Sequence, residues 1–557
     1  MWCLFLISVG IGTVIGQNEE SLVVNIKQGP VRGYKQPDSN VFAFYGIPYA
    51  TAPTGRQKFM PPLPPPEWTE TLEAVQRHIV CIQPGFPNTQ EDCLVANVYV
   101  PHTNQTNLPV MVIVHGGGFQ SLYGSILHPT ALVNSTNMIA VSFNYRLGAH
   151  GFLCLGTEEI PGNSGMKDQV ALLRWVQDNI AQFGGNPNDV TIEGCSAGSA
   201  SVDLLSVSPM AKGLFHKIIA GSGSNVATFG VQLDPVENAR IYARALNFDR
   251  VDDLDALEEF YKTAPYETLL SDIEAITVRP DSMILFGPCV EADLGSERFL
   301  DDAPFNILRQ QTTTRYPMLY GFTNLDGLLH IDHFDNWKSM MNERFSDFVP
   351  ADLHFENNEE KEDVAAKIKQ FYFGDEDVSE SNILSYIEFI TDTIFAQPML
   401  RNVRLHSEFG DNPMYIYEYS YWDNNTDYVP HTTERGANHC DQVIAVMDEN
   451  VTDSTLAYIE MKEIMREIYS NFITLGVPVP EGSSLPAWPP ADVQRTPHMS
   501  IGSILQLQGS PTQSRADFWD EIYDKYYKAP IPPRSSAFQL IFSPYFVIVM
   551  LVINIMK

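Results

Sequence analysis

Continuous apolar runs separated by turn residues are the main pattern of this chain. Four of them lie at Leu108–Val114, Val190–Ile192, Tyr316–Gly321 and Met414–Tyr419. Runs of this kind are typical of strands that are covered on both faces, and here they alternate with segments of helical periodicity. The pattern predicts an α/β fold with a large, twisted, mostly parallel central sheet and helices on both faces.

The chain has 557 residues, which by length alone would correspond to roughly three or four domains. No linker rich in Gly/Ser or Pro divides residues 20–525, however, and no internal repeat is evident. We therefore expect one large domain, with loop and helix insertions that roof the functional site.

The clearest helix prediction covers residues 455–473. Ser454 is a candidate N-cap, and Gly476 follows the predicted C-terminus. Such a helix would bury an apolar stripe at helical spacing, formed by Leu456, Ile459, Ile464 and Ile468.

The most informative motif is the G-x-S-x-G pentapeptide Gly194–Gly198, which follows the run Val190–Ile192. Between a strand and a helix, this motif places its serine on a sharp turn that exposes the hydroxyl group at the edge of a sheet. A simple Gly/Ser turn is the alternative interpretation of an isolated match. Ser196 is thus a candidate nucleophile. A nucleophilic Cys195 is disfavoured, because that register would place Glu193 and Ala197 where the turn needs glycines.

A serine nucleophile also needs an oxyanion hole, a base and an acid. Gly116–Gly118 follow the run Leu108–Val114, and successive glycines leave N–H groups that can approach a negative oxygen closely. Asp326 follows the run Tyr316–Gly321, and His439 lies in a polar loop after Met414–Tyr419. Each could be an ordinary loop residue by itself, but together they have the chain order serine, acid, histidine of this class of site.

The chain resembles the type-B carboxylesterases of the carboxylesterase/cholinesterase family, in particular insect-like carboxylesterases, over nearly its whole length. The resemblance is carried by ordered blocks beside the glycine motifs, at residues 45–50 (YGIPYA), 91–94 (EDCL), 144–148 (NYRLG), 162–169 (GNSGMKDQ), 183–187 (FGGNP), 222–224 (SGS) and 518–519 (FW).

The resemblance implies an α/β-hydrolase fold and a serine esterase that needs neither a metal nor an organic cofactor. It implies that Ser196 is the nucleophile, His439 the general base and Asp326 the orienting acid. The oxyanion-hole amides would come from Gly117, Gly118 and Ala197. The family more often has Glu at the acid position, but Asp can perform the same role.

The resemblance also implies a disulfide between Cys81 and Cys93. In the choline-ester members of the family, the first disulfide loop carries a tryptophan that holds a quaternary ammonium group. The loop 82–92 has no Trp, so we expect small-molecule neutral esters rather than choline esters as substrates.

The pairing of Cys154, Cys195, Cys289 and Cys440 stays open. Position 195 is Cys where many members carry Glu, and we expect a small buried thiol there. Because Cys195 adjoins Ser196 and Cys440 adjoins His439, the alternative is a disulfide between them, which requires a Cα separation below about 7 Å.

The formal net charge of −33 argues against nucleic acid as a partner and against charge-driven adhesion to anionic lipid. We attribute this charge to the solubility of an extracellular protein. Steering of a cationic substrate is the alternative explanation.

The two ends of the chain indicate export. Residues 1–16 resemble a signal peptide, and residues 535–557 form a hydrophobic C-terminal segment that predicts a GPI-anchor signal or a single membrane span. Residues 17–534 would then form the single carboxylesterase domain, outside the cell and tethered to its surface, with the C-terminal anchor as its only membrane contact. Four N-x-S/T sequons are candidate glycosylation sites, at Asn104, Asn134, Asn424 and Asn450.

Two functions from different classes fit this resemblance. The first is an extracellular carboxylesterase, and the second is a non-catalytic adhesion or binding protein of the neuroligin type. The presence of Ser196, Asp326 and His439 favours the hydrolase, because adhesion relatives typically lose the serine.

Overall fold

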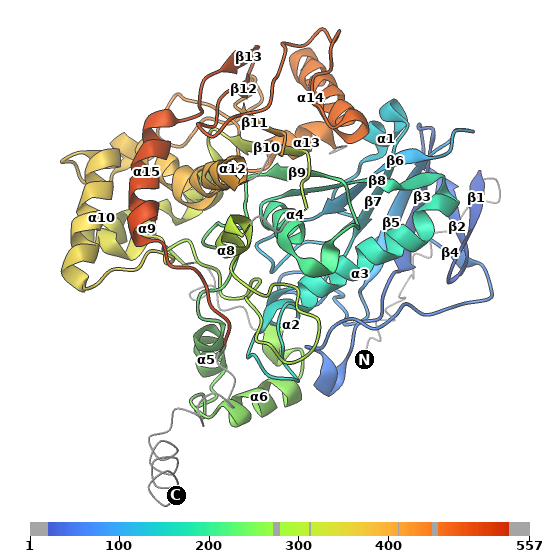
Figure 1. The fold of residues 1–557 in the computed structure, drawn as a ribbon, viewed down its shortest axis with the longest axis horizontal. Helices are drawn as coiled ribbons and strands as arrows, with labels where there is room; N and C mark the ends of the chain where they lie inside the picture. The colour runs from blue at the N-terminus through green and yellow to red at the C-terminus, as the bar shows by residue number, and fades with distance from the viewer. Residues whose placement is uncertain (1–19, 271–278, 311–313, 410–411, 448–454, 534–557) are drawn as a thin grey trace, which may run out of the picture.

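The computed structural model describes residues 20–270, 279–310, 314–409, 412–447 and 455–533. Within these residues, thirteen strands form a single sheet that curves through the molecule, with helices on both faces (Figure 1). The predicted fold class is confirmed.

The strands have the following bounds: β1 Ser21–Ile26, β2 Gly29–Lys35, β3 Val41–Pro48, β4 Leu72–Glu73, β5 Val95–Pro101, β6 Leu108–Val114, β7 Ile139–Phe143, β8 Gly185–Cys195, β9 Lys217–Gly221, β10 Met318–Thr323, β11 Met414–Tyr419, β12 His498–Ile501 and β13 Leu505–Gln508.

The centre of the sheet is parallel, in the order β7-β6-β8-β9-β10-β11-β12. Antiparallel strands extend it at both edges, with β1, β2, β3 and β5 on one side and β13 on the other. Parallel neighbours end at the same edge, so the loops that follow β6, β8, β10 and β11 meet there.

The helices have the following bounds: α1 Thr130–Thr136, α2 Gly148–Phe152, α3 Ser164–Asn179, α4 Ala197–Val207, α5 Pro235–Ala245, α6 Leu254–Thr263, α8 Pro304–Arg309, α9 Phe334–Glu343, α10 Asn358–Phe373, α11 Ile383–Ile390, α12 Gln397–Phe409, α13 Asp441–Val446, α14 Leu456–Leu475 and α15 Gln513–Tyr526. A 3₁₀ helix, η5, spans Asp326–His333, and a π-helix, η8, spans Thr391–Ala396.

Strand β6 shows why the sheet is apolar on both faces. Val110 and Val112 belong to the larger buried cluster, with residues of α3 and α4. Met111 and Ile113 point to the opposite face and belong to a second cluster, with residues of α13 and α14. Since side chains alternate along a strand, a continuous apolar run is what two covered faces require.

The predicted helix at 455–473 exists as α14, but its details differ from the expectation. Thr455 is the N-cap, and its hydroxyl accepts a hydrogen bond from the N–H of Tyr458 at 3.1 Å. Ser454 lies outside the described residues. Leu456 and Ile459 are 80% and 43% exposed, so half of the predicted stripe was wrong. The buried face lies further round the helix and relies on Met and aromatic side chains, namely Met461, Met465, Ile468, Tyr469, Phe472 and Ile473.

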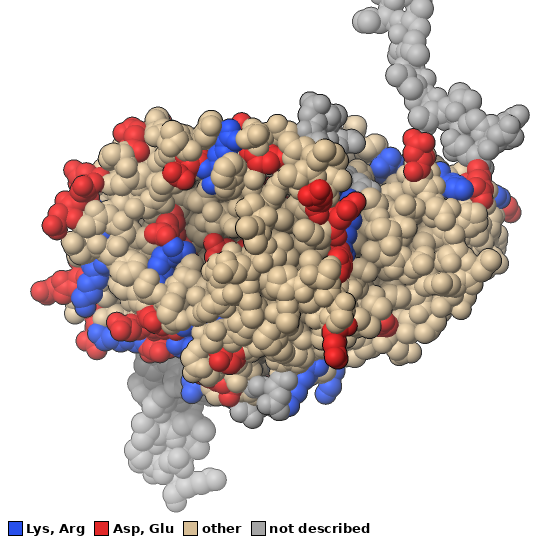
Figure 2. All heavy atoms as spheres, turned by 90° about the horizontal axis from the view of Figure 1, so that it is seen from above, with Lys and Arg blue, Asp and Glu red and all other residues tan. Residues whose placement is uncertain are grey.

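The surface is acidic but mixed. Figure 2 shows Asp and Glu side chains scattered over one face among basic and uncharged ones, with no single-sign patch covering that face. Within the described part of the chain, no helix has the length and apolar character needed to cross a bilayer. Residues 1–16 and 535–557 lie outside the described residues.

Candidate active site

Ser196 lies on the sharp turn between β8 and α4, as the G-x-S-x-G motif predicts. Its backbone has φ 61° and ψ −128°, a conformation that non-glycine residues rarely adopt. A Cβ at Gly198 would lie 2.2 Å from the carbonyl oxygen of Val114, and one at Gly194 would lie 2.4 Å from the backbone of Gly198. Both glycines are therefore required by close backbone packing.

The glycine loop that follows β6 packs against this turn. A Cβ at Gly116 would lie 2.8 Å from the carbonyl oxygen of Cys195. Gly117 and Gly118 have φ of +93° and +60°, and their N–H groups have no hydrogen-bond acceptor among the described residues. Ala197 is the first residue of α4, where N–H groups lack an intrahelical acceptor. Among the described residues, the N–H groups of Gly117 and Gly118 therefore have no acceptor, and Ala197 begins a helix where an N–H group is expected to be available.

His115 holds the start of this loop. Its ring stacks on Tyr145 with centroids 4.3 Å apart, and the hydroxyl of Tyr145 donates to the His115 carbonyl at 2.9 Å. Burial lowers the pKa of His115 to about 4. This imidazole is neutral at physiological pH, so it adds no positive charge to the site.

Asp326 and His439 are brought into direct contact, although 113 residues separate them. Nδ1 of His439 lies 2.8 Å from Oδ1 of Asp326, and the carboxylate is fully buried. The other oxygen, Oδ2, accepts hydrogen bonds from the Ser222 hydroxyl and the Thr323 N–H, both at 2.9 Å. The orientation of the carboxylate is therefore fixed from both sides.

Ser196 and His439 line one cavity of about 530 Å³, together with the glycine loop. Nε2 of His439 has no hydrogen-bond partner among the described residues. Phe395, from η8, packs on the His439 ring with centroids 4.4 Å apart. The rest of the wall is mainly apolar and includes Leu122, Ile126, Phe229, Met283, Leu329 and Ile394.

The described residues contain three disulfides. Cys81 pairs with Cys93, as the resemblance implied. Cys195 pairs with Cys440 across the floor of the cavity, with Cα atoms 6.1 Å apart, so the expectation of a buried thiol at position 195 was wrong. Cys154 pairs with Cys289, a bond that sequence spacing did not reveal.

Two further polar residues near the site were not identified from the sequence. Ser222 contacts Asp326, and its only signal was its place in the Ser222–Ser224 block. Glu193 lines the cavity from β8, and both of its carboxyl oxygens are buried without a partner among the described residues. Burial raises the pKa of Glu193 to about 8. A charged residue type within an apolar strand, next to the serine motif, was the signal for this position.

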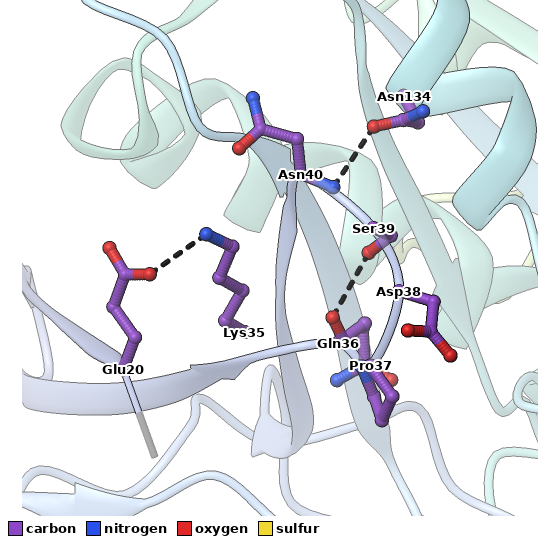
Figure 3. A pocket seen from close by; sticks show the side chains of 8 residues that line it. All are labelled: Glu20, Lys35, Gln36, Pro37, Asp38, Ser39, Asn40 and Asn134. Atoms are coloured by element: carbon purple, nitrogen blue, oxygen red, sulfur yellow. Dashed lines mark hydrogen bonds and ion pairs between the residues drawn. The ribbon is translucent and has the colours of Figure 1, made fainter. Parts of the chain in front are cut away.

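A separate shallow hollow lies at the antiparallel edge of the sheet (Figure 3). Lys35 forms an ion pair with Glu20 at 2.8 Å there, and Oδ1 of Asn134 accepts a hydrogen bond from the Asn40 N–H at 3.0 Å.

Among the predicted glycosylation sites, Asn134 is exposed, as are Asn104 and Asn424. The fourth sequon, at Asn450, lies outside the described residues.

The fold and the meeting of these loops at one sheet edge define an α/β-hydrolase. The chain belongs to the carboxylesterase family, whose sequence profile matches residues 20–519. The family predicted from the sequence is confirmed, and the protein is a carboxylic ester hydrolase.

The relatives of this chain include esterases and a neuroligin. Over 91% of this chain and 95% of the relative, the sequence is 30% identical to venom carboxylesterase-6 of Apis mellifera. The crystal structure of juvenile hormone esterase from Manduca sexta, with OTFP covalently attached, has a TM-score of 0.81 at 28% identity, covering 91% of this chain and all of the other. Neuroligin-2 of Mus musculus is 30% identical over 74% of this chain and 54% of its own length.

Proposed function

We propose that the protein hydrolyses carboxylic esters through an acyl-enzyme on Ser196. The observation that carries this proposal is the contact of His439 with buried Asp326 at 2.8 Å, in the cavity that also contains Ser196 and the free glycine N–H groups. Because the Nδ1–H group of His439 donates a hydrogen bond to the Asp326 carboxylate, Nε2 is the basic nitrogen. Nε2 has no hydrogen-bond partner among the described residues.

In the first half-reaction, Ser196 Oγ attacks the ester carbonyl carbon while His439 Nε2 takes the hydroxyl proton. The carbonyl oxygen becomes an oxyanion that accepts hydrogen bonds from the N–H groups of Gly117, Gly118 and Ala197. His439 then returns the proton to the departing alkoxide. In the second half, water attacks the acyl-enzyme by the same route and releases the acid. Asp326 stabilises the imidazolium that forms twice in this cycle.

Neutral esters fit the cavity better than choline esters. The disulfide loop at 82–92 has no tryptophan to hold a quaternary ammonium group. Glu193 is protonated at neutral pH, since burial holds its pKa at about 8. Arg279, which also lines the cavity, is itself a cation and is paired with Asp281 at 3.0 Å, so it offers a substrate cation no partner. A substrate cation therefore finds no ionised carboxylate among the cavity-lining side chains that the structure describes.

A non-catalytic binding function, as in a neuroligin-like protein, is the alternative. The relation to neuroligin-2 keeps this alternative in view. Retention of Ser196 on its strained turn, next to free N–H donors, supports the hydrolase, because a binding surface has no need of this strain.

Replacement of Ser196 tests the proposal. We expect Ser196→Ala to abolish hydrolysis of 4-nitrophenyl butyrate and labelling by a fluorophosphonate, because both need the hydroxyl nucleophile. Ser206→Ala, in the last turn of α4, is the matched control and should keep both activities. Substantial turnover by Ser196→Ala, or a labelled residue other than Ser196, would contradict the assignment.

We further propose that residues 1–16 direct the chain into the secretory pathway, that residues 17–534 form the catalytic domain, and that residues 535–557 specify a tether at the outer cell surface. Three disulfides fit an oxidising compartment. Asn104, Asn134 and Asn424 are exposed and thus accessible to glycosylation. Asn450 is proposed from its sequon alone.

Expression of the full chain in insect cells tests the location. We expect esterase activity on intact cells, a loss of mass with peptide N-glycosidase, and release of activity by a phospholipase C specific for phosphatidylinositol. Surface activity that resists this phospholipase would indicate a membrane span instead of a GPI anchor. Activity found only in the cytosol would refute the whole proposal.

A further inference from the structure

One histidine of the cavity wall has no part in the proposed mechanism. His330 lies in η5, four residues after Asp326, and lines the cavity with Ser196 and His439. Its backbone departs from helical angles, with φ −108° and ψ 21°, and its carbonyl accepts a hydrogen bond from the Tyr386 hydroxyl at 3.0 Å. Tyr386 is fully buried, so this contact fixes the backbone of His330.

Aromatic stacking holds the ring of His330. Its centroid lies 5.1 Å from that of Trp337, with the two planes 24° apart. The ring of His333 lies 5.8 Å away. Neither ring nitrogen of His330 has a hydrogen bond to a described residue, and Nδ1 is buried. The imidazole is therefore positioned by its faces, while its hydrogen-bonding edge is unused.

The imidazole is neutral at physiological pH. Burial is the main cause that lowers the pKa of His330 to about 4, and the neighbouring His333 and His439 lower it further. A neutral imidazole has one N–H donor and one acceptor. It can therefore bind an uncharged oxygen of a ligand without introducing a charge beside His439.

The surroundings of His330 make this polar edge distinctive. The wall of the cavity is built mainly from apolar side chains suited to hydrocarbon, among them Phe229, Met283, Ile284, Leu329, Ile394 and Phe395. Other polar side chains also line the cavity, among them Gln120, Ser121, Glu193, Arg279 and Ser282. Beside the apolar residues next to it, the unpaired imidazole of His330 rewards a ligand that places a hydrogen-bonding partner opposite it, because an unpaired polar group in an apolar site is unfavourable.

We propose that His330 is a specificity-determining residue that selects apolar esters carrying one additional hydrogen-bonding oxygen, such as an ether, ketone or hydroxyl, in the part bound near His439. This inference rests on the proposed function, since it assigns His330 to the substrate site of the same cavity. It names a substrate class that the apolar wall alone would not select.

Positional isomers provide the test. The substrates are 4-nitrophenyl heptanoate and three analogues in which an ether oxygen replaces the methylene at carbon 4, 5 or 6. The isomers have nearly equal polarity, so hydrophobic partition affects them alike. Each kcat/KM is divided by the rate of hydroxide-catalysed hydrolysis of the same ester, which removes differences in intrinsic reactivity.

We expect the wild-type protein to prefer one isomer over the others by about five- to tenfold, the effect of one hydrogen bond. His330→Phe, which keeps a ring to stack on Trp337, should make the three isomers equivalent. His330→Gln, which keeps an N–H donor, should retain part of the preference. If His330→Phe does not fold, His330→Leu replaces it.

Equal normalised rates for the three isomers in the wild-type protein would overturn the inference, and so would an unchanged preference in the variants without a donor. These outcomes are separate from failure of the proposed function. That failure would appear as no turnover of the parent heptanoate and no fluorophosphonate label on Ser196.

Discussion

The disulfide between Cys195 and Cys440 joins the residue before Ser196 to the residue after His439, with Cα atoms 6.1 Å apart. It closes a loop of 245 residues in sequence separation and forms part of the cavity wall. The proposed nucleophile and base, which come from different loops, are thus linked through one covalent bridge.

Removal of this bridge should affect catalysis as well as stability. For the double variant Cys195→Ala/Cys440→Ala we expect the free energy of unfolding to fall by about 2–5 kcal/mol. We also expect kcat to fall by about tenfold or more, because a small displacement between nucleophile and base is costly. Urea unfolding and steady-state kinetics on 4-nitrophenyl butyrate measure the two effects.

The double variant Cys154→Ala/Cys289→Ala is the matched control, since that disulfide does not line the cavity. It should lose stability while the folded fraction keeps its kcat. Equal losses of kcat in the two double variants would contradict a positioning role for Cys195–Cys440.

The buried carboxylate of Asp326 should matter far more than the hydroxyl that supports it. We expect Asp326→Asn to lower kcat by about 10⁴-fold, because the amide cannot stabilise the imidazolium and can favour the wrong tautomer of His439. Ser222→Ala removes one of two hydrogen bonds to Oδ2 and should lower kcat by about tenfold at most. Pre-steady-state kinetics would measure both, and similar losses in the two variants would contradict the assigned roles.

The glycine loop offers a pair of nearly identical substitutions with different consequences. A Cβ at Gly117 would lie 2.2 Å from the Ser121 carbonyl oxygen, whereas nothing lies within 4 Å of a Cβ at Gly118. Both positions have positive φ, so both substitutions carry some strain.

We expect Gly117→Ala to displace the loop and lower kcat by about 10²-fold or more, the effect of losing one oxyanion donor. Gly118→Ala should retain most of the activity. Steady-state kinetics on 4-nitrophenyl butyrate would distinguish them, and a larger loss at Gly118 would show that the N–H donors are arranged differently.

Glu193 should make the protein less stable as pH rises. Burial raises its pKa from 4.5 to about 8, so the folded state keeps a proton that the unfolded state releases between these values. The free energy of unfolding therefore falls through this window, by about 1.4 kcal/mol per pH unit. Glu193→Gln removes this dependence, and its stability relative to the wild type should be higher at pH 8 than at pH 5.

Urea unfolding of both proteins at pH 5, 6.5 and 8 measures this difference. Glu521→Gln, at an exposed position of α15, is the control and should follow the wild type at each pH. A stability difference between Glu193→Gln and wild type that stays constant from pH 5 to pH 8 would show that Glu193 does not hold a proton in the folded state.

The fold class, the family and the candidate site could all be predicted from the amino-acid sequence. The run Leu108–Val114 indicated the sheet and the glycines around Ser196 indicated the nucleophile, because strands covered on both faces and sharp backbone turns place strict local demands on residue type. The family was identified from the ordered blocks along the chain. Asp326 and His439 were identified from their order in the chain and from the resemblance to a family.

Which side chains meet became evident only in the folded protein. Cys154 pairs with Cys289, Ser222 contacts Asp326, and His330 lines the cavity beside His439, although nothing in the local sequence specifies these contacts. The buried face of α14 also differed from the predicted stripe, because packing against the sheet selected Met465 and Phe472 over Leu456 and Ile459. Such contacts depend on how distant segments pack, and local periodicity does not encode that packing.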